Sequence, residues 1–260
     1  MKNTFWFKSL RLWVQGFLLL ALRWAQLRSG FDPVTGLSRQ NLPGTILAAL
    51  LLFLAAAEAI LCFRLPGGKR TYLNCFSPFE QRHLPFLVAG SFLLGVGAVL
   101  LPGGGMMAIA AAVTGAATTV GLLLFAASLR RGNAPRALPL LPAMVFSVLF
   151  LLMIYLPEGS NPVLADYYLT VLTASLIACA FYQLAGLTLR EGKLRWFVFF
   201  GDLAIPLCLA SLADSAGDLG RTLTLLGCAL VLTVFLQLRR SEILPEPEPE
   251  EEGQPDTAQQ

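Results

Sequence analysis

The sequence predicts an all-α fold: a polytopic helical membrane protein with seven or eight transmembrane helices. Of its 260 residues, 56% are hydrophobic and only 13% are charged, whereas a soluble domain has about 25% charged residues. The apolar residues form blocks of about 17 to 24, long enough to cross a bilayer core of roughly 30 Å as helices. No link between these blocks exceeds about 21 residues, which leaves no room for a separate soluble catalytic domain.

Residues 1–41 permit two interpretations. Their apolar stretch of about eleven residues is short for a standard span. Lys8, Arg11 and Gln15 share one helical face, which suits an amphipathic helix on the membrane surface. Alternatively, residues 5–24 cross the bilayer as an imperfect first helix, with the Lys8 and Arg11 side chains extending to the interface. A polar link rich in turn-forming residues ends this region.

Residues 42–240 are expected to form the transmembrane helix bundle, and the first strong span in it carries a single charge, Glu58. Seven strong spans are predicted at residues 42–63, 85–101, 106–129, 138–156, 166–189, 196–213 and 222–238. The second and third of these form a helical hairpin, because only a Pro-Gly-Gly-Gly turn separates them. Both contain small residues four apart, such as Ser91 and Gly95, a spacing that lets helix backbones approach closely.

The distribution of positive charge predicts the orientation of the helices. Twelve Lys and Arg residues flank one end of the strong spans, against Arg221 alone at the other end. These twelve are Arg64, Lys69, Arg70, Arg82, Arg130, Arg131, Arg136, Arg190, Lys193, Arg195, Arg239 and Arg240. The positive-inside rule places them in the cytoplasm, and an imperfect first helix would bring Lys2 to the same side. We therefore prefer eight spans to seven, in the cytoplasmic (cell) membrane, with the C-terminus in the cytoplasm.

The chain ends in an acidic, Pro-rich tail, residues 241–260, which is expected to be disordered because it has few apolar residues to pack. Besides the lipid bilayer, the expected partners are a small solute or cation and a protein that binds the basic loops or this tail. Nucleic acid is not an expected partner, because the Lys and Arg residues are spread over membrane-flanking loops rather than gathered in one patch.

Two carboxylates within the predicted spans, Glu58 and Asp202, are the main candidates for a functional role. A charged side chain near a bilayer centre costs roughly 2.5 kcal/mol or more unless a partner offsets it. Pro206 lies four residues after Asp202 and cannot donate a hydrogen bond to the Asp202 carbonyl. A carboxylate beside such a carbonyl is the type of broken-helix arrangement that coordinates ions or protons in transporters. The alternative is an acid that only hydrogen-bonds a neighbouring helix as part of its packing.

Three further polar residues lie at the same predicted depth in the membrane and extend this candidate site. Counted from the nearest boundary residue at 1.5 Å per residue, Glu58 and Asp202 both lie roughly 9 to 10 Å inside the bilayer. The same count puts Gln183, Ser91 and Thr233 in that layer. Because isolated polar groups facing lipid are costly, we expect all five to point inward and line one substrate- or ion-binding site. At least one of the two carboxyl groups is expected to be protonated when no cation is bound.

These features favour a small secondary transporter or ion-coupled permease. The alternative is a non-transporting membrane subunit, scaffold or sensor of a larger complex. An enzyme is not expected, because the sequence has a single histidine, His83, and no motif that pairs a nucleophile with a base and an orienting group. No cofactor or metal is expected either: the five cysteines include no CxxC pair and suit small buried positions.

Overall fold

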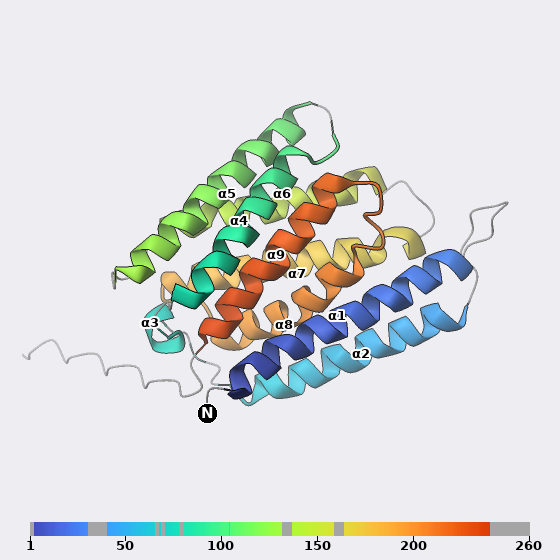
Figure 1. Ribbon diagram of the computed structural model, residues 1–260, viewed down its shortest axis with the longest axis horizontal. Helices are drawn as coiled ribbons and strands as arrows, with labels where there is room; N and C mark the ends of the chain where they lie inside the picture. The colour runs from blue at the N-terminus through green and yellow to red at the C-terminus, as the bar shows by residue number, and fades with distance from the viewer. Residues whose placement is uncertain are drawn as a thin grey trace, which may run out of the picture.

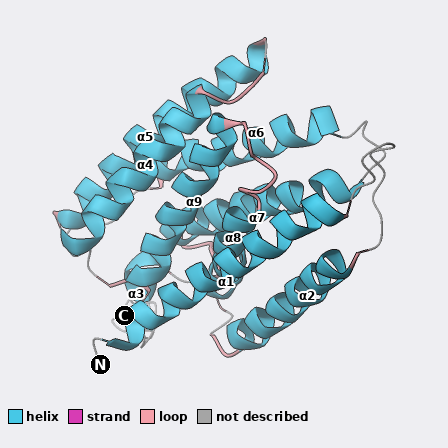
Figure 2. Ribbon diagram, turned by 45° about the vertical axis from the view of Figure 1, so that its right-hand side comes forward, coloured by secondary structure: helices cyan, strands magenta, loops and turns pink. Residues whose placement is uncertain are grey.

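The computed structural model describes residues 3–30, 41–65, 68, 71–77, 81–103, 105–131, 137–158 and 164–239. The predicted tail at 241–260 and much of the link before residue 41 lie outside these residues. The helices are α1 (Asn3–Ser29), α2 (Leu42–Phe63), α3 (Tyr72–Cys75), α4 (Leu84–Val99), α5 (Met106–Arg130), α6 (Leu141–Glu158), α7 (Leu164–Thr188), α8 (Leu194–Ala210) and α9 (Leu219–Leu238). Over the described part of the chain no strand occurs, in agreement with the predicted all-α fold (Figure 2).

Within the described residues, six helical segments are long and apolar enough to cross a membrane. They cover Leu42–Phe63, Gln81–Val99, Met106–Arg130, Leu138–Pro157, Tyr167–Thr188 and Leu219–Leu238. A multi-pass helical architecture is therefore confirmed at this coarser level, whereas the predicted seven or eight spans are not. Charged residues interrupt the apolar run of α1, and α8 has only 17 residues. α8 also ends at Ala210 rather than at the predicted residue 213, because the chain turns over residues 211–217.

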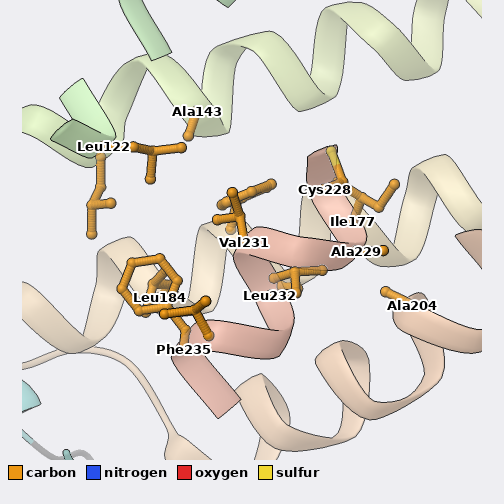
Figure 3. Packing of buried hydrophobic residues seen from close by; sticks show 14 of the residues in the cluster. Leu122, Ala143, Ile177, Leu184, Ala204, Cys228, Ala229, Val231, Leu232 and Phe235 are labelled. Carbon is orange, nitrogen blue, oxygen red and sulfur yellow. The ribbon is translucent and has the colours of Figure 1, made fainter. Parts of the chain in front are cut away.

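α9 lies in the interior of the bundle, between α4 on one side and α8 on the other (Figure 1). α5 and α6 continue the bundle beyond α4, whereas α1 and α2 lie beyond α8 at the opposite edge (Figure 1). Figure 3 shows apolar side chains of α5 to α8 converging on α9; among them are Leu122, Ala143, Ile177, Leu184 and Ala204. The core is thus built around the last helix of the chain.

The hairpin of α4 and α5 has the close backbone approach that its small residues predict. A Cβ atom added at Gly115 would overlap the Cβ of Ala98, and one added at Gly95 would overlap the Thr119 hydroxyl. Thr119 Oγ1 donates a hydrogen bond to the Ser91 carbonyl across the same interface, at 2.9 Å. Small residues therefore let a polar side chain of one helix reach the backbone of the other.

A second close approach, between α4 and α9, was not predicted. A Cβ atom added at Gly97 would lie 2.5 Å from the Thr224 backbone nitrogen, and one at Gly227 would lie 2.5 Å from the Leu94 nitrogen. Both glycines face the backbone of the other helix rather than a flexible side chain. The distance between α4 and α9 is therefore set by the absence of a side chain at these two positions.

α1 and α2 run antiparallel, and each buries one narrow stripe (Figure 1). Asn41 joins them: its Oδ1 accepts a hydrogen bond from the Gly44 nitrogen at 2.9 Å, and its Nδ2 donates to Ser29 Oγ at 3.1 Å. The buried stripe of α2 consists of Leu47, Leu54, Glu58 and Cys62. That of α1 consists of Leu12, Gly16, Leu19, Arg23 and Gln26. Each stripe thus contains one charged residue that points into the bundle.

Candidate functional site

Glu58 forms an ion pair with α1. Arg11 Nη2 donates to Glu58 Oε1 at 2.6 Å. The Glu58 side chain is only 3% exposed, whereas that of Arg11 is 43% exposed. The other carboxylate oxygen, Oε2, is buried and has no hydrogen-bond partner among the described residues. The Arg11 guanidinium therefore offers a second way, besides protonation, to offset the burial of this carboxylate. One carboxylate oxygen of Glu58 is left without a hydrogen-bond donor from the described part of the chain.

Asp202 lies on α8, which contacts both α1 and α2. Cys62, one turn after Glu58, lies within electrostatic range of both Asp202 and Glu58. The positive charges of Arg195 and Arg239 also interact electrostatically with Cys62. That Glu58 and Asp202 share one site stays a prediction. The helix is not broken at Pro206, because α8 continues through it to Ala210.

Thr233 contacts a different face of α1 from Glu58. Trp13 Nε1 donates to Thr233 Oγ1 at 3.2 Å, and Thr233 in turn donates to the Ala229 carbonyl at 2.6 Å. Arg11 and Trp13 are two residues apart, so they point roughly 200° apart around the axis of α1. α1 therefore separates Thr233 from Glu58.

Ser91 and Gln183 have partners elsewhere. Ser91 Oγ is buried and donates to the Leu87 carbonyl of its own helix at 2.7 Å. Gln183 Oε1 accepts a hydrogen bond from the Lys193 backbone nitrogen, at 3.2 Å, where the loop leads into α8. Of the hydrogen bonds given above, none joins Ser91 or Gln183 to Glu58. Their place in one polar site with the two carboxylates remains a prediction.

Another ion pair, buried on both sides and not predicted above, joins α1 to the turn after α8. Arg23 Nε donates to Asp214 Oδ1 at 2.7 Å, and Arg23 Nη1 donates to Gln26 Oε1 at 3.0 Å. Thr170 Oγ1 donates to Asp214 Oδ2 at 3.1 Å, and the guanidinium lies 5.4 Å from the centroid of the Tyr168 ring. We call these five residues the Arg23 cluster.

The ion pair of Arg23 and Asp214 is less exposed to solvent than that of Arg11 and Glu58, and more of its carboxylate oxygens accept hydrogen bonds. The side chains of Arg23 and Asp214 are 0% and 9% exposed, and both Asp214 oxygens accept hydrogen bonds. Such a pair suits a fixed anchor for α1. The Glu58 pair, in contrast, has a partly exposed cation and a buried carboxylate oxygen for which the described residues supply no donor. That arrangement suits the exchange of one cation for another.

The helical spacing of residues in α1 contains a sequence signal for the Arg23 cluster. Leu12, Gly16, Leu19, Arg23 and Gln26 follow at intervals of four and three, the spacing of one helical face. Arg23 thus occupies a position in an apolar stripe, where a charged side chain needs a partner. The partner itself could not be read from this pattern, because Asp214 is far away in the sequence.

Within the described ranges, no group of three or more His, Cys, Asp and Glu side chains could hold a metal ion. The cysteines are free thiols, and all but Cys179 are buried. Comparisons with known proteins found no match to this chain among family models, curated proteins or solved structures.

Proposed function

We propose that this protein is a small ion-coupled transporter in which Glu58 exchanges Arg11 for a proton or another cation. The observation that carries the proposal is the state of the Glu58 carboxylate. It is buried, one of its oxygens is held by a partly exposed guanidinium, and the other has no hydrogen-bond partner among the described residues. Asp202, on α8, which contacts α2, supplies the second carboxylate of the proposed site.

The exchange follows from the cost of an uncompensated buried charge. Removing one partner of a buried ion pair costs about 3 to 5 kcal/mol, so Glu58 needs Arg11, a proton or another cation at all times. A cation that binds at Oε2 weakens the attraction between Glu58 and Arg11, and Arg11 can then turn to solvent. Departure of the cation draws Arg11 back. Binding at Glu58 is in this way coupled to a movement between α1 and α2.

Eight membrane-spanning helices are part of this proposal. α1 has 27 residues, about 40 Å at 1.5 Å per residue, and packs against α2 and α8. Two of its charged side chains, Arg11 and Arg23, have acidic partners in the bundle. Twelve of the 17 residues of α8 are buried among other helices, so α8 need not match the bilayer thickness by itself. We place the C-terminus in the cytoplasm and the protein in the cell membrane.

Proteoliposomes that contain this protein alone test the proposal. An imposed pH gradient or a gradient of Na⁺ or K⁺ is expected to drive a flux, which is measured with a trapped pH dye or an ion-selective electrode. Glu58→Gln and Asp202→Asn are expected to abolish coupled flux while the protein stays folded. Arg221→Gln, a control at an ion pair whose side chains are 23% and 20% exposed, should leave the flux unchanged.

Coupled flux through Glu58→Gln at the wild-type rate would contradict the proposed role of this carboxylate. Absence of flux for all tested ions, together with stable co-purification of a second chain, would favour the alternative of a non-transporting subunit, scaffold or sensor.

A further inference from the structure

A hollow of about 380 Å³ lies between the start of α6, the end of α7 and the start of α8. This volume falls within the range of about 300 to 1,000 Å³ that is common for small-molecule sites. Leu141, Met144 and Leu189 contribute apolar surface to its wall, whereas Gln183 and Lys193 contribute an amide and an ammonium group. The hollow therefore offers both an apolar surface and hydrogen-bond donors.

Two of its polar groups have unused hydrogen-bond donors. Gln183 Oε1 accepts the hydrogen bond from the Lys193 backbone nitrogen at 3.2 Å, which fixes the orientation of the amide and leaves Nε2 to donate elsewhere. Over the described part of the chain, neither Gln183 Nε2 nor Lys193 Nζ has an acceptor. Glu191, which also lines the hollow, has an interaction of its own and is not required as a ligand. An ammonium and an amide NH₂ group can therefore donate to one anionic ligand.

The loop that carries Lys193 is held in place before any ligand binds. The Glu191 nitrogen donates to the Gly186 carbonyl at 3.0 Å, and Gly186 and Gly192 pack backbone against backbone. Arg190, with φ of 62°, turns the chain back over the end of α7. Binding in the hollow would consequently require little ordering of this loop.

The aromatic residues of the hollow place it at the level of the lipid head groups. Trp196 and Tyr182 line it, and both side chains are exposed. Trp and Tyr are enriched at membrane–water interfaces, because their rings have an apolar body and a polar tip. Residues 190–195, at the same end of α7 and α8, contain three basic residues and one acid. Basic pockets between membrane helices attract anionic head groups, so a phospholipid of the surrounding leaflet can reach this hollow.

We propose that this hollow binds an anionic phospholipid of the phosphatidylglycerol type. The Lys193 ammonium and the Gln183 amide nitrogen donate hydrogen bonds to the phosphate oxygens, and an acyl chain lies along the apolar wall formed by Leu141 and Met144. A zwitterionic lipid carries the same phosphate, but the cation in its head group opposes the charge of Lys193. The anionic lipid is therefore preferred. This lipid-binding site does not depend on transport.

The fluorescence of Trp196 tests this proposal, because bromine atoms on an acyl chain quench a neighbouring indole. Trp6→Phe, Trp13→Phe and Trp24→Phe leave Trp196 as the only tryptophan. This variant is reconstituted in phosphatidylcholine bilayers that contain a small, varied fraction of brominated phosphatidylglycerol or brominated phosphatidylcholine. The quenching should show that phosphatidylglycerol binds about fivefold more tightly than phosphatidylcholine, the factor expected for one Lys side chain near anionic lipid.

Two substitutions in the hollow should remove this preference. Lys193→Gln removes the charge and keeps the backbone nitrogen that is bonded to Gln183. Gln183→Glu keeps an acceptor for that nitrogen and adds a negative charge to the hollow. Millimolar inorganic phosphate should leave the quenching of the Trp196 variant unchanged, because a soluble anion lacks the acyl chain that lies along the apolar wall.

Arg131→Gln, at an exposed residue outside the hollow, removes the same charge as Lys193→Gln and is the matched control; it should keep the preference. Equal binding of the two brominated lipids would overturn the proposal, as would a preference that survives Lys193→Gln. An equal loss in Arg131→Gln would show that overall surface charge, and not the hollow, attracts the lipid. Relief of quenching by inorganic phosphate would identify a site for soluble anions instead. If Lys193→Gln does not fold, the result for Gln183→Glu decides.

Discussion

Arg23 and Asp214, which are 191 residues apart in the sequence, form an ion pair in which Nε lies 2.7 Å from Oδ1. The pair connects the first long helix to the turn between α8 and α9. Neither side chain has more than 9% of its surface exposed. A charged residue of α1 is therefore neutralised inside the bundle, which explains how a helix with several cations can pack among apolar helices.

We predict that breaking this pair destabilises the protein strongly. Arg23→Ala or Asp214→Ala leaves a buried charge without its partner, and each should lower the free energy of unfolding by about 3 to 5 kcal/mol. The double variant should lower the free energy of unfolding by less than the sum of the two single variants, because no isolated charge remains. Arg221→Ala, at a partly exposed pair, should cost about 1 kcal/mol or less. Unfolding in mixed micelles with increasing denaturing detergent measures these differences; equal effects at both pairs would contradict the prediction.

The contact between Trp13 and Thr233 is expected to contribute little. Interhelical hydrogen bonds in a membrane protein average about 0.6 kcal/mol in double-mutant cycles, and the distance of 3.2 Å is at the long end for a hydrogen bond. A cycle of Trp13→Phe and Thr233→Val, measured by the same unfolding assay, should give a coupling energy of that size. A coupling above about 2 kcal/mol would show that Thr233 has a larger role than this bond.

Gly227→Ala should push α9 away from α4, because the new Cβ atom would lie 2.5 Å from the Leu94 nitrogen, which is backbone. Overpacking of this kind typically costs about 1 to 3 kcal/mol. Gly68→Ala is the matched control, since nothing lies within 4 Å of its added Cβ atom. Thermal unfolding of both variants in detergent tests the difference, and an unchanged midpoint for Gly227→Ala would show that the two helices can separate at little cost.

Labelling by an impermeant thiol reagent on intact cells tests the proposed eight spans. Thr35 lies in the link between α1 and α2, outside the described residues. If α1 crosses the membrane, Thr35→Cys, in a variant without the five native cysteines, should be labelled from outside. Gly68→Cys, beyond the other end of α2, should be labelled only after the membrane is permeabilised. Labelling of Thr35→Cys only after permeabilisation would reject eight spans in this orientation.

Tyr72 gives a prediction for alkaline pH. Its hydroxyl is buried and has no hydrogen-bond partner in the described part of the chain, and its ring stacks on Phe76 at 4.3 Å between centroids. Burial raises the pKa of Tyr72 above its usual value of about 10. The folded state therefore favours the neutral phenol. Above about pH 10 the phenol ionises more readily in the unfolded state, so the free energy of unfolding falls as pH rises; below that pH this loss is absent.

Tyr72→Phe removes this unpaired group and should stabilise the protein by about 1 kcal/mol at neutral pH. Unfolding measured between pH 8 and pH 11 should show an additional loss of stability in the wild type above about pH 10. The Tyr72→Phe variant should lack this loss. Parallel pH profiles for the two proteins would show that Tyr72 does not titrate on unfolding.

The sequence by itself determined the features that depend on neighbours along the chain. Hydrophobic length predicted seven strong spans, and six of them are confirmed, among the described residues, as segments long and apolar enough to cross a membrane. Small residues four apart predicted the close approach of α4 and α5. The helical spacing of α2 also determined that Glu58 shares a face with Leu47 and Leu54. These are local properties, since helix periodicity and the cost of exposing polar backbone in lipid act over short stretches of chain.

Only the tertiary structure decided which helices meet and which charges pair. Glu58 finds Arg11 and Arg23 finds Asp214 across 47 and 191 residues, and no local pattern specifies such partners. Equal depth in the membrane predicts contacts between side chains less well, because residues at one level can face different neighbours. Thr233 and Glu58 contact two faces of α1 for this reason. Depth is set by the position along a helix, whereas contact also requires the rotation of each helix, and packing between helices determines that rotation.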